Sequence, residues 1–215
     1  MTDLVWMPGD EGCRSRKVPV AGVLHHWTAG SGDAPAVIRT LKARGLSIHY
    51  VLDSHGVITQ RADPATTVCY HGGSRANERF LGIEISNKAL GTPKPGRPQA
   101  TAAGRAHGRT FSVLDFTDAQ YASIVALADE LSERFDIPRV CATGHTVMKP
   151  AALARFSGHL EHIHCSPRKI DCAGLVMANS VTVGVNPQQQ TMCIFGFKNT
   201  DTLFDVVGWW VEATS

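Results

Sequence analysis

The clearest pattern along the chain is a series of short apolar runs separated by turn residues. Residues 18–26 (VPVAGVLHH) are almost continuously apolar until they end at two adjacent histidines. Such a run is typical of a central strand that is buried on both faces. Residues 47–53 (SIHYVLD) and 56–60 (GVITQ) read as a hairpin, and residues 80–86 (FLGIEIS) read as a further strand.

Two segments carry helix signals. In residues 32–45, Asp33 is a candidate N-cap, a proline follows in the first turn, and the segment ends on a glycine. Residues 116–135 have apolar side chains along one helical face, and Thr117 precedes Gln120 with the spacing of a capping box. We therefore predict a short helix in the first segment and a long helix in the second.

The remaining segments are less regular. Residues 91–109 are rich in Pro, Gly and Arg, which predicts a long surface loop. Residues 139–145 (RVCATGH) read as a short strand that ends on a histidine, as residues 18–26 do. Residues 146–168 are irregular and histidine-rich, and residues 175–215 show no repeat. No second full domain is indicated.

Composition fits one globular domain and excludes several classes of protein. The 215 residues are 43% hydrophobic and 19% charged, which is ordinary for a soluble domain. The 21 basic and 19 acidic residues are scattered, so nucleic acid is not an expected partner. The amino-terminal residues do not resemble a signal peptide, and long apolar runs are absent from the sequence. We expect synthesis in the cytoplasm and no membrane partner.

Cysteine and histidine usage narrows the chemistry. The six cysteines form no CxxC motif, which favours reduced thiols. The ten histidines are the compositional outlier. A catalytic zinc needs three protein ligands and one open position, and neutral imidazole is a common ligand. His25 or His26 and His145 are candidates for two ligands, with Asp171 or Cys172 as the third, although each histidine alone also fits a hydrogen-bonded core position.

Several segments, in order, resemble the zinc-dependent N-acetylmuramoyl-L-alanine amidases. The matching segments are VLHHWTAG, SIHYVLDSHGVITQ, YHGGSRANERFLGIEISN, FTDAQYASIVALADEL, IPRVCATGH and RKIDCAG. The family includes phage endolysins, cytoplasmic muropeptide-recycling amidases and peptidoglycan recognition proteins. The resemblance implies a single α/β domain in which helices flank a central mixed sheet. Residues 1–175 would form the zinc amidase catalytic domain, and residues 176–215 would form an extension packed on it.

The resemblance also implies a ligand set. The first zinc ligand would be His25, which directly follows two aliphatic residues, with His26 as the alternative. The second would be His145. The third would be Asp171, two residues after Lys169, with Cys172 as its rival.

Residues 146–168 add length that the family normally lacks at this point. A side chain of this insertion could therefore replace one of the expected ligands. The candidates are His159, His162, His164 and Cys165.

Catalytic roles follow from the same resemblance. Zinc would polarise the amide carbonyl and acidify its bound water. Glu84 would take the proton from that water and pass it to the departing amine. The alternative is that Glu84 only completes a polar network. Lys169 would stabilise the developing oxyanion, unless it is an ordinary surface lysine. Ile48 stands where some relatives carry a catalytic tyrosine, so more of the chemistry falls on Glu84.

Substrate contacts are implied for a second group of residues. His71 and Asn77 match the family's substrate-binding loop, and His49 matches a histidine that supports the site. Cations of the long loop could meet the carboxylates of the stem peptide, although ordinary solvated charges are the simpler interpretation; these cations are Arg97, Arg105 and Arg109. Trp209 and Trp210 could stack on sugars, but they fit the packing of a terminal segment better.

The resulting hypothesis is a Zn²⁺ hydrolase that cuts between N-acetylmuramic acid and L-alanine in peptidoglycan. We expect a monomeric phage endolysin that reaches the cell wall through a membrane lesion. One alternative is a cytoplasmic amidase that recycles soluble muropeptides. Others are a non-catalytic peptidoglycan-binding module, which would typically lack the third ligand, and a metal-free structural protein of a phage particle.

Overall fold

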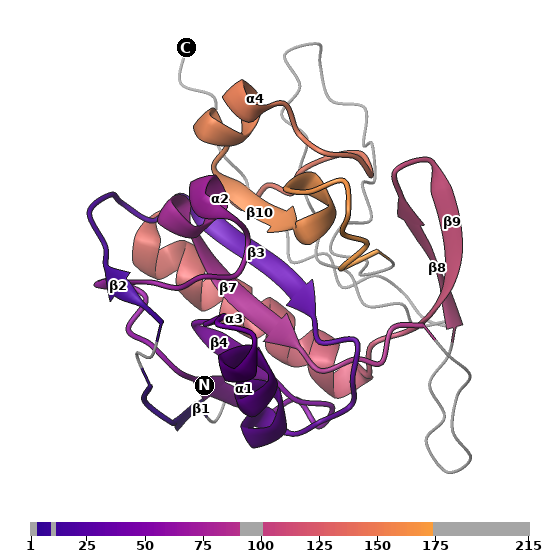
Figure 1. The fold of residues 1–215 in the computed structure, drawn as a ribbon, viewed down its shortest axis with the longest axis horizontal. Coiled ribbons are helices and arrows are strands. Elements are labelled where there is room, and N and C mark those ends of the chain that lie inside the picture. The colour runs from indigo at the N-terminus through magenta and orange to yellow at the C-terminus, as the bar shows by residue number, and fades with distance from the viewer. Residues whose placement is uncertain (1–3, 10–11, 91–100, 174–215) are drawn as a thin grey trace.

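The computed structural model describes residues 4–9, 12–90 and 101–173, and its centre is a six-stranded sheet (Figure 1). The strands β4 and β5 are antiparallel, and every other neighbouring pair in this sheet is parallel. In spatial order they are β1 (Leu4–Trp6), β5 (Ile58–Gln60), β4 (Tyr50–Leu52), β7 (Phe80–Ile85), β3 (Gly22–Trp27) and β10 (Gly158–Glu161).

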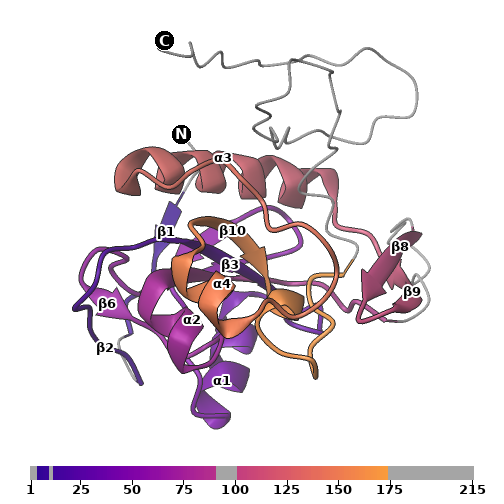
Figure 2. The same ribbon diagram turned by 90° about the horizontal axis from the view of Figure 1, so that it is seen from above.

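Helices cover both faces of the sheet (Figure 2). The long helix α3 (Asp118–Phe135) lies across one face, where Ile124, Leu127 and Leu131 join the main core. The other face carries α1 (Ala34–Ala43), α2 (Ser74–Arg79) and α4 (Pro150–Arg155). The predicted fold, a central mixed sheet flanked by helices, is confirmed.

β3 lies inside this sheet and is buried along its whole length, as its apolar sequence predicts. Successive side chains of a strand point to opposite faces. Val23 and Trp27 accordingly join the core beneath α3, whereas Leu24 packs with Ala76 and Leu153 on the opposite face. The two histidines of β3 must therefore serve different faces of the sheet.

The predicted helix signals are also confirmed. The Asp33 carboxylate accepts the backbone N–H of Ala36 at 3.0 Å. Thr117 and Gln120 form the reciprocal capping box that starts α3. The predicted hairpin is present as the antiparallel pair of β4 and β5. A separate two-stranded ladder joins β2 (Arg14–Ser15) to β6 (Thr67–Val68).

The loop prediction for residues 91–109 is wrong in its second half. β8 (Thr101–Ala106) pairs with β9 (Arg109–Leu114) as an antiparallel hairpin. The turn uses positive φ angles of 50° at His107 and 76° at Gly108. Small residues hide the strand in the sequence because they give no alternation of apolar and polar positions. Residues 91–100, and with them Arg97, lie outside the described residues.

The predictions for residues 139–145 and 146–168 also need correction. Within residues 139–145 only Cys141 makes a bridge, to His159. The segment predicted to be irregular instead contains α4, β10 and the short 3₁₀ helix η1 (His162–His164). β10 takes the position beside β3 because its backbone pairs there in parallel register.

Two further findings concern the ends of the domain and membranes. Among the described residues, no helix is both long enough and apolar enough to cross a bilayer. The predicted carboxy-terminal extension, residues 176–215 with Trp209 and Trp210, lies outside the described part of the chain.

Candidate functional site

Three potential metal ligands converge at the carboxyl edge of the sheet, and we call them the ligand cluster: His26, His162 and Asp171. The Nδ1 atoms of His26 and His162 are 2.8 Å apart. The Oδ2 atom of Asp171 lies 2.8 Å from Nδ1 of His162 and 3.3 Å from Nδ1 of His26. All three residues are buried, with relative exposures of 3%, 6% and 7%.

The sheet topology brings these residues together. His26 lies near the end of β3, and His162 follows directly after the neighbouring parallel strand β10. Parallel strands end at the same edge of a sheet, which is where α/β proteins usually place their sites. The backbone N–H of Ile163 donates to the carbonyl of Asp171 at 2.9 Å and so holds the Asp171 segment against η1.

His26 is prepared as a neutral ligand. Burial, followed by the neighbouring His162, lowers the pKa of His26 to about 4. Its other ring nitrogen, Nε2, lies 2.9 Å from Nδ1 of His71. When Nε2 carries the proton and donates it to His71, the lone pair of Nδ1 points into the ligand cluster. An outer hydrogen bond of this kind commonly fixes the tautomer of a metal-binding histidine.

Asp171 supplies the negative charge of the cluster. Burial by itself raises the pKa of this carboxyl, but the interactions with His162 and His26 outweigh burial and hold the pKa below its usual range. Asp171 is therefore ionised at neutral pH. Zinc ligands about 2.0–2.2 Å from the ion lie about 3.3 Å from one another in a tetrahedral site. The separations of 2.8–3.3 Å and the donor set of two imidazoles and one carboxylate fit such an ion.

Glu84 stands beside the ligand cluster on β7, where it pairs with His26 in the parallel register. Its side chain is buried. Burial, together with the charge of Asp171, raises the pKa of Glu84 to about 8, while Lys169 acts in the opposite direction. A carboxyl group that titrates near neutral pH can accept and return a proton.

Lys169 is half-buried on the segment that leads to Asp171. Its positive charge lowers the pKa of both Glu84 and His26, so it acts on the same small volume. The imidazole of His107, at the tip of the β8–β9 hairpin, lies 2.8 Å from the carbonyl oxygen of Lys169 through Nε2. The hairpin therefore contacts the segment that carries two of the expected functional residues.

The three residues expected to bind substrate form a supporting layer. The Asn77 side-chain oxygen accepts the backbone N–H groups of His71 at 3.0 Å and Gly72 at 2.7 Å. His49 accepts the N–H of Gly82 at Nδ1, and its Nε2 lies 3.1 Å from the carbonyl of Thr67. The Asn77 bonds tie the His71 loop to α2, and the His49 bonds link β7 to β6. A substrate-binding role for His49, His71 and Asn77 stays a prediction.

The structure brings His26, and not the preferred His25, to the ligand cluster. Because adjacent residues of β3 face opposite ways, His25 points beneath α3. Its Nε2 lies 3.4 Å from Nδ1 of His159, whose Nε2 lies 3.2 Å from the hydroxyl of Ser132. His25 is fully buried there, among helix and sheet residues.

The structure does not bring His145 to the ligand cluster either. His145 lies on an exposed loop, where its carbonyl accepts the N–H of His107 at 2.6 Å. The position beside His26 goes to His162 because β10, and not residues 139–145, is the parallel neighbour of β3. A helix start at Pro150 followed by the short segment Gly158–Glu161 was the available signal. The strand was not predicted because His159 and Glu161 interrupt its apolar pattern.

Asp171, and not its rival Cys172, supplies the third atom of the ligand cluster. The Cys172 side chain is fully buried in the main core. Burial and the neighbouring carboxylates raise the pKa of its thiol well above the usual value. A thiol in that state is a poor metal ligand, because metals bind the thiolate.

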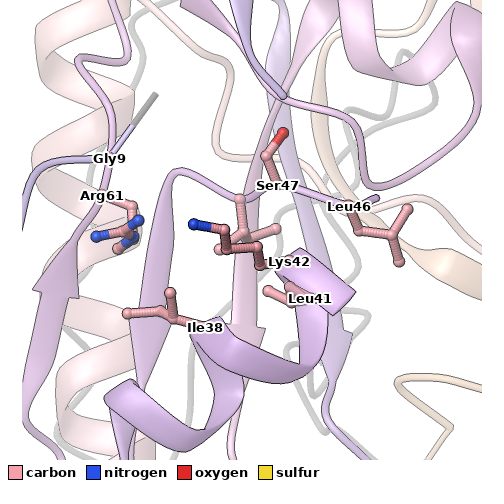
Figure 3. A pocket seen from close by; sticks show the side chains of 8 residues that line it. Gly9, Ile38, Leu41, Lys42, Leu46, Ser47 and Arg61 are labelled. Atoms are coloured by element: carbon pink, nitrogen blue, oxygen red, sulfur yellow. The ribbon is translucent and has the colours of Figure 1, made fainter. Parts of the chain in front are cut away.

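A separate small pocket lies between α1 and the residues around β5 (Figure 3). Its lining contains no histidine, cysteine or carboxylate, so it lacks the chemistry of the ligand cluster. The lining residues are Gly9, Ile38, Leu41, Lys42, Leu46, Ser47, Ile48 and Arg61.

Comparisons with known proteins identify the family and the fold. Residues 16–171 match the sequence family described as N-acetylmuramoyl-L-alanine amidase. The fold is similar to that of the N-acetylmuramoyl-L-alanine amidase LysC from Clostridium intestinale URNW, with 15% identity and a TM-score of 0.50 over 77% of this chain and 86% of that one. It is also similar to a mutant endolysin from Bacillus subtilis, with 18% identity and a TM-score of 0.50 over 80% of this chain and 90% of that one. No curated protein matches the sequence.

Proposed function

Because the chain belongs to the N-acetylmuramoyl-L-alanine amidase family, we propose that it is a zinc hydrolase that cleaves the bond between N-acetylmuramic acid and L-alanine. The family makes it an amidase of peptidoglycan. The finer proposal is that it acts on the intact wall as a phage endolysin. The fold shared with a solved endolysin supports this.

One observation carries the proposal: Nδ1 of His26, Nδ1 of His162 and Oδ2 of Asp171 all lie within 4.8 Å of one another. Two imidazole nitrogens 2.8 Å apart, with a buried carboxylate oxygen beside them, form a compact donor set that a divalent cation can share. His26, His162 and Asp171 would hold zinc, which when bound supplies Lewis-acid chemistry toward an amide carbonyl and a water molecule.

The chain's own residues supply the proton transfer. The Glu84 carboxylate takes a proton from the attacking water and passes it to the nitrogen of the departing L-alanine. The carbon–nitrogen bond breaks as that nitrogen becomes an amine. Lys169 places a positive charge beside the carbonyl oxygen, which becomes negative when the water adds. The effect of the Lys169 charge, which lowers the pKa of Glu84, supports this division of roles.

The substrate would be a muramoyl-peptide strand of the cell wall. Arg105 and Arg109 are exposed on the β8–β9 hairpin, whose tip contacts the Lys169 segment. They are placed to meet the carboxylates of a stem peptide. The protein would work as a monomer, bind neither nucleic acid nor membrane, and reach the wall through a membrane lesion made by another protein.

Digestion of purified sacculi by the metal-loaded protein tests this proposal. The expected result is loss of turbidity together with newly exposed amino groups of L-alanine and no new reducing sugar ends. A parallel assay uses soluble muropeptides as substrates. Activity on the soluble fragments alone would overturn the endolysin assignment in favour of a recycling amidase, and activity on neither would overturn the proposed reaction.

A further inference from the structure

Two cysteine sulfurs outside the ligand cluster face each other. Sγ of Cys13 and Sγ of Cys69 are 3.1 Å apart, although the residues are separated by 56 positions in the chain. Cys13 precedes β2 and Cys69 follows β6. The antiparallel register that pairs Arg14 with Val68 places these two cysteines opposite each other.

The surrounding backbone already holds the sulfurs in place. The Ser47 hydroxyl donates to the carbonyl of Gly12 at 3.1 Å and accepts the N–H of Tyr70 at 2.8 Å. It thus joins the two residues that flank the cysteine pair on one side. On the other side, the Arg16 guanidinium donates to the carbonyls of Thr67 and Glu78, each at 2.8 Å.

We propose that Cys13 and Cys69 are a disulfide-forming site, closed when the protein meets a low-molecular-weight disulfide. A disulfide bond is about 2.05 Å long, so the sulfurs need to approach by about 1 Å. Side-chain rotation supplies that movement without displacing the paired strands. The proposal rests on this register and is independent of the proposed hydrolase function.

The thiol–disulfide exchange proceeds in two steps. The thiolate of Cys13, which is half-buried whereas Cys69 is fully buried, attacks one sulfur of the small disulfide. A mixed disulfide forms and one small thiol leaves. Cys69 then attacks the Cys13 sulfur, loses its proton, and releases the second small thiol. The protein gives up two electrons and two protons, and the small disulfide takes them up.

The cross-link would add a covalent bond to a short ladder of the domain. β2 and β6 form a ladder of only two residue pairs outside the main sheet. Cys69 also lies two residues before His71, whose ring contacts His26. A covalent bond at this point would fix the amino-terminal segment and the start of the His71 loop together.

Incubation of the full-length, metal-loaded protein with oxidised glutathione tests the proposal. We expect the loss of two alkylatable thiols, a linked Cys13–Cys69 peptide in a proteolytic map, and a Tm higher than in dithiothreitol by about 5–10 °C. The Cys13→Ser variant should lose the linked peptide and the Tm difference.

Cys141→Ser is the matched control, because Cys141 is also half-buried, and it should behave as the wild type does. Should both thiols stay alkylatable, or should glutathione remain attached to Cys13, the proposal is overturned. A linked peptide that joins Cys13 to any other cysteine would overturn it as well. The peptide map of the wild-type protein keeps the test decisive even where a variant fails to fold.

Discussion

At the scale of single residues, the site depends on which face of β3 each histidine occupies. His25 and His26 are neighbours in sequence, yet one lies beneath α3 and the other in the ligand cluster. The sequence could show that a strand ended on two histidines, but it could not show which of them pointed into the ligand cluster. That choice depends on the register of β3 with β7 and β10. Asp171 was predictable because it lies on the same short segment as Lys169.

Substitution of His162 distinguishes the ligand cluster from the sequence-based expectation. Removing even an outer partner of a metal ligand costs about 10–100-fold in metal affinity or activity, so His162→Ala should cost more than that. Zinc content measured by plasma emission and the initial rate of sacculus digestion are the readouts. His145→Ala is the matched control. It should retain its zinc and at least half of the rate, because His145 is exposed and outside the ligand cluster.

Glu84→Gln separates metal binding from proton transfer. The amide is nearly the same size as the carboxyl, so the buried position should stay filled. It cannot accept a proton, which should lower kcat by about 10²–10⁴-fold. Zinc content should stay at the wild-type level. Wild-type turnover in this variant would remove Glu84 from the mechanism.

At the scale of elements, the sequence predicted the helices that have capping residues and periodic apolar positions. α1 and α3 begin where Asp33 and Thr117 predict. β10 and the β8–β9 hairpin were missed because short strands with histidine or small residues carry no periodic signal. β10 takes its position from long-range pairing with β3, whereas β8 and β9 form a local hairpin with each other. The missed element β10 is the one that delivers His162.

The β8–β9 hairpin should influence activity through its tip. The His107 ring contacts the carbonyl of Lys169, and a hydrogen bond contributes about 1 kcal/mol. His107→Ala should therefore lower the Tm by about 2–4 °C and, because it loosens the Lys169 segment, lower kcat/KM by up to about 5-fold. Kinetics on a soluble muramoyl-peptide and calorimetry measure the two effects. Thr110→Ala, an exposed change on the same hairpin, should leave both unchanged. An equal response of the two variants would show that the tip contact is immaterial.

At the scale of the whole molecule, buried neutral histidines link stability to pH. Burial lowers the pKa of His49 and of His159 from 6.5 to about 4. The unfolded chain therefore binds more protons than the folded one between these two values. The contribution of these two histidines to the free energy of unfolding is complete above pH 6.5 and is lost as the pH falls toward 4. Each group contributes about 3 kcal/mol over the full window.

Denaturant unfolding of the metal-free protein at pH 7 and at pH 5 measures this linkage. We expect a lower free energy of unfolding at pH 5. His159→Gln removes one of the titrating groups, so the difference between the two pH values should shrink in that variant. The same difference between pH 7 and pH 5 in His159→Gln as in the wild type would show that His159 is not buried in its neutral form.

The proposed function depends on one zinc ion held by residues from β3, from η1 and from the Asp171 segment. Anomalous diffraction from a crystal of the zinc-loaded protein, recorded on both sides of the zinc absorption edge, tests it most directly. We expect a single strong peak about 2.0–2.2 Å from Nδ1 of His26, Nδ1 of His162 and Oδ2 of Asp171. A peak at His25 or His145, or no peak at the ligand cluster, would contradict it.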